Sequence, residues 1–376
     1  MQDKVSKFVE LFEDMPDERQ EWKIKHKLID IIFIAVAATI ADCDDWEDME
    51  WFANLKEDWF RKYLELPNGI PSHDTIERVF AWLDPVIFRQ KFLEWVGLAT
   101  SGGGDGVVAI DGKTMRGSRD GEKKPLHVVN AWFSENKMFL SQVFTGEKSN
   151  EITAIPELLD ILSVSGHIVT IDAMGTQKGI ASKIIDKQGD YVLALKQNQP
   201  NLFEDVKLFF DTELNSPEYA VSTFSKREKG HGRIECRQYY ITDQIEWLAQ
   251  KEEWKNLTSI GMVRCRAENI TTGAKTDATR YFISSLPADV HRFAYAVRCH
   301  WGIESAHWSL DTTFNEDGRR SRKNNSAKNL AQLLRLAYDI IKANGVPKRT
   351  SIKRLRKDAL VKDAYLEKLI SNVFVS

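Results

Sequence analysis

Two short apolar segments, each followed directly by an aspartate, place the strongest constraint on how this chain can fold. Val107–Ile110 precedes Asp111, and Ile168–Ile171 precedes Asp172. Four consecutive apolar residues predict a short buried strand, and a carboxylate at the end of such a strand is held on a rigid frame. Carboxylate oxygens suit hard divalent cations such as Mg²⁺. Because an aspartate after a strand often only caps a turn, the interpretation depends on where the two strands lie.

The order of the predicted elements indicates that the two aspartates can meet. The strand at 107–110 is followed by strands at 127–133 and 138–144 around a polar turn, a helix at 149–163 capped by Ser149 or Asn150, the strand at 168–171, a helix at 178–187 and a strand at 191–195. Three antiparallel strands followed by α/β crossovers form a mixed sheet with helices on its faces. In such a sheet the first and fourth strands can be neighbours, which would bring Asp111 and Asp172 to one edge.

A third carboxylate, Glu304, lies in a segment with helical spacing, followed by His307, Trp308 and Asp311. Residues at i+3, i+4 and i+7 share a helix face with residue i. A face of this composition suits an ion site better than a core, because buried carboxylates without a cation are costly. We therefore predict a metal site of Asp111, Asp172 and Glu304, with Asp311 as a further candidate. Two ions there could hold the attacking and leaving oxygens of a phosphodiester, so cleavage and joining of nucleic acid is the leading hypothesis.

The charge is unevenly distributed along the 376 residues. The net charge is -3, but residues 1–60 hold 16 Asp and Glu against 7 Lys and Arg, so the remainder is net positive. A basic footprint for nucleic acid is therefore expected after the first quarter of the chain. The longest apolar run, Ile31–Ala41, is shorter than the roughly 20 residues that span a bilayer. The four cysteines form no CxxC pair, which favours free thiols in a cytoplasmic protein without membrane attachment.

Composition shifts divide the chain into four parts. Residues 1–100 are predicted to be helical, with helices over 28–41 and 46–60, a turn at 67–71, Ser72 as the cap of the next helix, and Asp84-Pro85 at the start of another. Two helices around a tight turn permit either DNA recognition or a packing or dimerising role. The glycine-rich segment 101–106 predicts a linker. Residues 101–200 and 286–345 form the α/β part, including helices over 288–318 and 326–344. Residues 201–285, with a helix at 202–210 and strands at 233–241, 259–268 and 279–284, form a β-rich insertion, and residues 346–376 form a basic C-terminal tail.

Several cations are candidate contacts to DNA phosphates. Lys113 and Arg116 follow Asp111 closely, and their alternative role is to neutralise that carboxylate. The segment 226–237 predicts a phosphate-contacting loop, with a solvated hairpin as the alternative. Arg319–Lys323 and the cations of 348–357 could follow the DNA beside the site. The full set of predicted DNA contacts is Lys113, Arg116, Lys196, Lys226, Arg227, Lys229, His231, Arg233, Arg237, His300, Arg319, Arg320, Arg322 and Lys323.

At this point several blocks of sequence carry a resemblance to a known family. They are Ile70–Val79, Ala109–Ser118, Glu147–Glu157, Thr170–Gln177, Tyr281–Ser285 and His300–Glu304. In this order they resemble the H-repeat-associated insertion-sequence transposases, DDE enzymes linked to Rhs elements in bacteria. The resemblance spans nearly the whole chain. It implies a ribonuclease H-like catalytic domain with a β-rich insertion, preceded by an all-α domain.

The resemblance also implies an activity and its requirements. Asp111, Asp172 and Glu304 correspond to the family's catalytic carboxylates, which bind Mg²⁺, with Mn²⁺ as a substitute. The implied reaction is two-metal cleavage at insertion-sequence ends and strand transfer into target DNA, by a homodimer acting on double-stranded DNA in the bacterial nucleoid.

The chain departs from the family pattern at three places. Thr176 replaces a cysteine, Gln197 replaces a glycine, and the stretch between Glu304 and His307 is one residue short. One residue turns a helix by about 100°, so one alternative is a catalytically decayed or domesticated DNA-binding protein. A second alternative is a nuclease that cuts without joining, because both activities use the same metal site.

Overall fold

The computed structural model describes residues 2–99, 106–121, 124–146, 150–230, 232–347 and 350–371, with the backbone alone for 2–6 and 98–99. The predicted linker falls almost entirely outside these ranges, as do His231, Ser149, Lys348 and Arg349. The elements before the first strand are all helical. They are α1 (Gln2–Glu13), η1 (Glu21–Lys23), α2 (Leu28–Ile40), α3 (Trp46–Leu55), α4 (Glu57–Phe60), α5 (His73–Trp82) and α6 (Pro85–Ala99).

Helix α2 confirms the prediction of a core helix, because all of its residues are buried. Proline begins α6 as predicted, and Asp84 Oδ1 accepts a hydrogen bond from the Val86 amide at 2.7 Å. The prediction that the Ser72 side chain caps α5 is wrong, although Ser72 does stand at the start of this helix. Ser72 occupies the N-cap position without a side-chain cap, and its hydroxyl lies 3.2 Å from the Thr75 hydroxyl instead.

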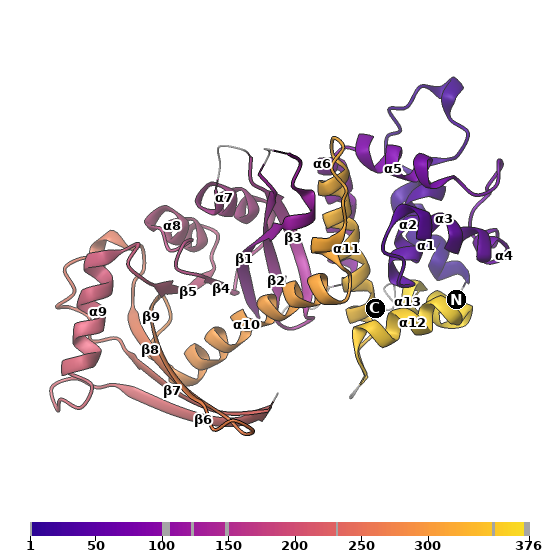
Figure 1. Ribbon diagram of the computed structural model, residues 1–376. Coiled ribbons are helices and arrows are strands. Elements are labelled where there is room, and N and C mark those ends of the chain that lie inside the picture. Colours follow the sequence, from indigo (N-terminus) through magenta and orange to yellow (C-terminus); the bar gives the residue numbers. More distant parts are fainter. Residues whose placement is uncertain are drawn as a thin grey trace.

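Nine strands form one mixed sheet (Figure 1), in the order β3-β2-β1-β4-β5-β9-β8-β7-β6. The ladders β1–β4 and β4–β5 are parallel, and the others are antiparallel. The strands are β1 (Val107–Met115), β2 (Leu126–Phe133), β3 (Met138–Phe144), β4 (Ile168–Ile171), β5 (Asp190–Leu195), β6 (Ser222–Gly230), β7 (Arg233–Thr242), β8 (Ser259–Asn269) and β9 (Lys275–Ser284). The crossover helices are α7 (Glu151–Ile161) and α8 (Lys178–Asp186), and α9 (Pro200–Thr212) precedes β6. The predicted mixed sheet with helices is confirmed.

The predicted adjacency of the first and fourth strands is also confirmed, but the predicted end of the first strand is wrong. Val107 to Ile110 pair in register with Ile168 to Ile171. Strand β1 then continues to Met115, because β2 pairs with it from Val108 to Met115 after β4 has ended. Asp111 is therefore a residue of the strand, opposite Asn130 of β2, at the point where β1 loses its parallel neighbour.

Residues 201–285 are rich in β-strand as predicted, and they contain one strand, β6, that was not predicted. Strands β6 to β9 extend the same sheet as a long curved arm (Figure 1). Of the two interpretations of 226–237, a phosphate-contacting loop and a hairpin, the described residues show the hairpin, in which β6 pairs with β7 and Lys226 lies opposite Arg237. Strand β6 is mostly exposed on both faces, so its sequence has no apolar alternation by which the strand could be recognised.

Helix α10 (Val290–Thr312) lies across the sheet, followed by η4 (Glu316–Gly318) and α11 (Ser326–Ala343). The helix predicted for 288–318 ends early, at Thr312, and Asn315 then adopts a left-handed conformation with φ 53° before η4. Helices α11, α2 and α10 share one apolar core with the β1–β3 face, including Ala109, Trp132 and Ile303. This packing fixes α10 above the strand that carries Asp111.

The basic C-terminal tail is largely a folded part of the structure. Residues 352–371 form α12 (Ile352–Val361) and α13 (Asp363–Ser371), which lie against the N-terminal helices (Figure 1). Arg356 is buried, donates to the Thr39 carbonyl oxygen at 3.0 Å and pairs with Asp42 at 2.8 Å. This cation holds the C-terminal helices in place. No helix in the described ranges has the length and apolar composition needed to cross a membrane.

Candidate active site

Asp111 and Asp172 directly follow paired residues of neighbouring strands. Ile110 and Ile171 are register partners, so the next residue on each strand carries its carboxylate at the same edge. Asp172 then begins a turn, in which its Oδ1 accepts hydrogen bonds from the amides of Met174 at 3.1 Å and Gly175 at 3.4 Å. The Thr176 hydroxyl donates to the Ala194 carbonyl oxygen at 2.7 Å and fixes this turn against β5. The sheet thus brings the two aspartates together.

The electrostatics of Asp172 are those of a group that a cation would stabilise. Burial raises the pKa of its carboxyl, and the negative charges of Glu151 and Asp111 raise it further. The Gly175 amide opposes these effects only in part. Oxygen donors whose ionised form is destabilised in this way fit a hard divalent cation.

Glu151 is a fourth carboxylate that the sequence analysis missed. It is the first residue of α7, and one of its oxygens lies 2.7 Å from His127 Nε2. A Cβ atom at Gly112 would lie 2.1 Å from Glu151 Oε1, so Glu151 contacts the backbone beside Asp111. Asn150 caps this helix as predicted, accepting from the Thr153 amide. The predicted cap could have identified Glu151 from the sequence, because the residue after the cap is the first residue of the crossover helix.

Glu304 reaches the same region from α10. His300, one turn earlier, places Nδ1 at 3.0 Å from the Thr170 hydroxyl of β4. Burial lowers the pKa of His300, and the charges of Asp111, Glu304 and Asp172 oppose that shift. The charges of all three predicted carboxylates therefore act on the His300 imidazole. His300 is hydrogen-bonded to the sheet and partly exposed, so its role as a DNA contact stays a prediction.

The prediction that Glu304, His307, Trp308 and Asp311 form one ion-binding face of α10 is wrong. His307 is buried, whereas Trp308 is 65% exposed and Glu304 is exposed. Residues at i+3 and i+4 lie about 100° apart around a helix, and here the border between core and solvent passes between them. Across the described ranges, no three His, Cys, Asp or Glu side chains form a preassembled metal cage.

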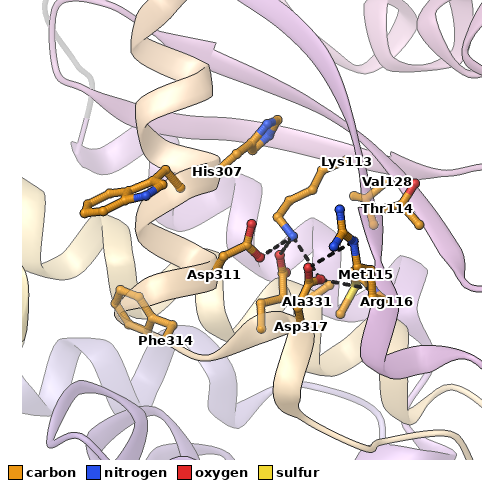
Figure 2. Close-up of polar contacts among 12 residues, drawn as sticks. Lys113, Thr114, Met115, Arg116, Val128, His307, Asp311, Phe314, Asp317 and Ala331 are labelled. Atoms are coloured by element: carbon orange, nitrogen blue, oxygen red, sulfur yellow. Dashed lines mark hydrogen bonds and ion pairs between the residues drawn. The ribbon is translucent and has the colours of Figure 1, made fainter. Parts of the chain in front are cut away.

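Lys113 forms a buried ion cluster instead of the predicted phosphate contact (Figure 2). Its Nζ lies 2.6 Å from Asp311 Oδ1, 2.9 Å from Glu316 Oε2 and 3.4 Å from Asp317 Oδ1. Asp311 is therefore held by an ammonium group rather than positioned as a metal ligand. Arg335 pairs with Glu316 at 2.6 Å, and neither side chain is exposed.

The pKa directions in this cluster show that its charges support one another. Burial alone would raise the pKa of Glu316, but the positive charges of Arg335 and Lys113 lower it below its usual value. Burial would lower the pKa of Lys113, but Glu316 and Asp311 raise it. The cluster ties strand β1 to the segment after α10.

Two more predicted DNA contacts are buried and internally paired. Arg319 donates to the Phe314 carbonyl oxygen at 3.0 Å and to Asp44 at 3.1 Å. Arg237 pairs with Glu228 at 2.6 Å and with Glu235, and its guanidinium lies 4.6 Å from the centre of the Trp301 ring. Both predictions are wrong, because these charges serve internal contacts.

The remaining predicted cations have exposed side chains. They are Arg116, Lys196, Lys226, Arg227, Lys229, Arg233, Arg320, Arg322 and Lys323. Four of them have carboxylate partners, which are Asp317 for Arg116 at 3.6 Å, Glu228 for Lys226 at 3.1 Å, Glu235 for Arg233 at 4.0 Å and Glu77 for Lys323 at 3.4 Å. Exposed pairs of this kind contribute little to stability, so these cations remain available to an anionic ligand.

Comparison with known proteins gives matches over nearly the whole chain. Residues 102–340 match the family described as "Transposase DDE domain", and residues 9–96 match "DDE_Tnp_1-associated". "Putative transposase YncI" of Escherichia coli O157:H7 is 40% identical over 363 residues, covering 95% of this chain and 93% of that protein. "H repeat-associated putative transposase YhhI" of Escherichia coli (strain K12) is 38% identical, covering 95% and 96%.

Among solved structures, a "piggyBac transposase synaptic complex with hairpin DNA" aligns with 100% of this chain and 83% of its own chain. The TM-score of this alignment is 0.43 and the sequence identity is 13%.

Proposed function

This chain belongs to the DDE transposase family, and we propose that it cleaves DNA at the ends of an insertion sequence and joins those ends to target DNA. One observation carries the proposal. The register of β1 and β4 brings Asp111 and Asp172 together, and the charges of both aspartates and of Glu304 act on His300. We assign these three carboxylates as the catalytic residues.

We propose Asp111, Asp172 and Glu304 as the residues that would hold Mg²⁺, with Mn²⁺ as a substitute. Their all-oxygen donor chemistry and the raised pKa of Asp172 support this assignment. Bound there, the metal would supply Lewis-acid stabilisation of charge on phosphodiester oxygens. Glu151 adds to the negative charge around Asp172, and its contact with His127 fixes its position.

The exposed cations would bind the DNA backbone. Arg227 and Lys229 lie on one face of the hairpin arm, since residues two apart in a strand share a face. Arg320 and Arg322 follow α10, the helix that carries Glu304, and are closer to Glu304 in sequence than Arg227 and Lys229 are. Phosphate contacts of this kind release counterions, so affinity should fall steeply with salt.

The finer features of the family follow as parts of the same proposal. The sheet order β3-β2-β1-β4-β5, with three antiparallel strands before two parallel ones, supports a ribonuclease H-like catalytic domain. We propose this domain for residues 101–200 and 286–345, with 201–285 as its insertion and 1–100 as an all-helical DNA-binding or dimerising domain. A homodimer acting on double-stranded DNA in the bacterial nucleoid is the working assembly.

The test is cleavage and strand transfer on DNA that carries the inverted repeats flanking the gene. Asp111→Asn and Asp172→Asn should abolish both steps in Mg²⁺ and leave DNA binding unchanged. Asp160→Asn is the matched control, because Asp160 is an exposed residue of α7 whose carboxylate pairs with Lys183 at 2.6 Å, on another helix.

Each outcome has a distinct meaning. Retained cleavage in Asp111→Asn or Asp172→Asn would refute the assignment of catalytic residues. A wild-type chain that binds the repeats without cutting them would favour a decayed DNA-binding protein, and one that cuts without joining a pre-cleaved end would favour a nuclease.

A further inference from the structure

The buried His307 side chain lies between Asp111 and Asn130, with one ring nitrogen facing each of them. The residue is 8% exposed, and its ring stacks on the Phe139 ring at an interplanar angle of 17°, with the ring centres 6.2 Å apart. Nδ1 lies 3.4 Å from Asp111 Oδ2, and Nε2 lies 3.1 Å from Asn130 Nδ2. Which nitrogen carries the proton decides whether the ring can donate to Asp111.

Asn130 determines that choice. This side chain is fully buried on β2, opposite Asp111. Arg335 Nε donates to Asn130 Oδ1 at 2.5 Å. An arginine side chain has only donors, so the amide oxygen must face Arg335 and the NH₂ group must face His307. His307 Nε2 therefore accepts a hydrogen bond, and the neutral ring carries its proton on Nδ1, toward Asp111.

Arg335 is itself fixed in place. It is fully buried, pairs with Glu316 at 2.6 Å and donates to the Ala331 carbonyl oxygen at 2.9 Å. Glu316 in turn binds Lys113 at 2.9 Å, on the same strand as Asp111. The orientation of the amide, and through it the tautomer of His307, is thus set by charges that cannot reorient without breaking buried ion pairs.

We propose that His307 is a positioning residue for Asp111, held in the Nδ1–H tautomer by Asn130 and Arg335. This inference rests on the proposed function, since it treats Asp111 as a ligand for a divalent cation. Asp111 lies close to Asp172 and Glu151, so its carboxylate needs support that does not neutralise it. A neutral N–H donor holds Oδ2 and leaves the negative charge available to a cation, whereas an ammonium group would compete with the ion.

The first test examines the tautomer directly, in the full chain without metal or DNA. Nitrogen-15 spectra of histidine-labelled protein should show one imidazole with a protonated Nδ1 and an unprotonated Nε2. The signal is assigned by its disappearance in His307→Asn. A protonated Nε2, with or without a proton on Nδ1, would overturn the inference whatever the protein's activity.

The second test uses two substitutions that each keep one half of the imidazole. Asn places an amide near the position of Nδ1 and can still donate to Asp111, whereas Gln reaches the position of Nε2 and keeps only the contact with Asn130. We expect Mn²⁺ titrated calorimetrically into the full chain to bind His307→Asn within about threefold of wild type. We expect His307→Gln to bind about 10-fold more weakly or worse, the range typical of lost partners of metal ligands.

Each variant loses one of the two side-chain contacts of His307, so each controls for the other, and their thermal midpoints should be similar. Equal Mn²⁺ affinities, or tighter binding by His307→Gln, would refute the positioning role. A wild-type chain that bound no Mn²⁺ would refute the proposed function and the metal-facing part of this inference, whereas the wrong tautomer would refute the inference alone.

Discussion

Replacing Lys113 by methionine should be among the most damaging single changes to the stability of this protein. Methionine keeps most of the length and packing of the lysine side chain and removes only its charge. In the native cluster Lys113 Nζ lies within 3.4 Å of Asp311, Glu316 and Asp317. Without it, Arg335 alone would face the fully buried Glu316, and Asp311 would lose its partner.

The magnitude follows from the burial of Lys113 and Glu316, whose side chains are 7% and 0% exposed. Removing one member of a buried ion pair typically costs about 3–5 kcal/mol, because the remaining charge stays desolvated. Arg116 provides the matched control, since it also faces Asp317, at 3.6 Å, but its side chain is 83% exposed. Arg116→Met should cost no more than about 1 kcal/mol, as exposed pairs do.

The assay is urea unfolding at neutral pH, followed by circular dichroism at low ionic strength. The pKa of Glu316 is lowered in the folded state, so its ion pairs stabilise the protein above the unfolded-state value of 4.5 and are lost as pH falls through the lower folded-state pKa. The gap between wild type and Lys113→Met should therefore narrow in acid. Adding Asp311→Asn should recover part of the loss, because one unpaired charge is removed. A Lys113→Met penalty equal to that of Arg116→Met would refute this account of the cluster.

Two further substitutions test the charge of Asp172 and the packing of α10 against the sheet. Asp172→Asn, in the absence of metal, should raise the thermal midpoint at pH 7, because the folded-state pKa of Asp172 is raised and its ionised form destabilises the fold. The gain in midpoint should vanish as the pH falls below the unfolded-state pKa of 3.8. An unchanged midpoint at pH 7 would contradict this expectation. Gly302→Ala should cost about 1–3 kcal/mol by overpacking, since a Cβ there would lie 2.1 Å from Trp132 Cη2. Gly179→Ala in α8 meets nothing within 4 Å and serves as the control, with an unchanged or slightly higher midpoint in the same thermal melts.

The sheet and the pair of aspartates could be predicted because they depend on local patterns and on general rules of chain connection. Four apolar residues before each aspartate specify a strand, and right-handed crossovers place parallel strands side by side. Strand β6 could not be predicted, because its polar residues carry no alternation. The extension of β1 beyond Asp111 depends on the pairing of β1 with β2. The residues of β1 alone contain no pattern that predicts this pairing.

The sequence by itself determined the family, the order of the elements and the two carboxylates that follow paired strand residues. Only the tertiary structure decided which charges lie inside. Lys113, Arg237 and Arg319 are indistinguishable in sequence from the exposed cations around them, yet each is buried against carboxylates. The partners of Lys113 and Arg319 lie about 200 or more residues away along the chain, as the 3.1 Å contact of Arg319 with Asp44 illustrates. Periodicity reports which face of an element is apolar, whereas the pairing of charges is set by distances between elements that only the packed structure brings together.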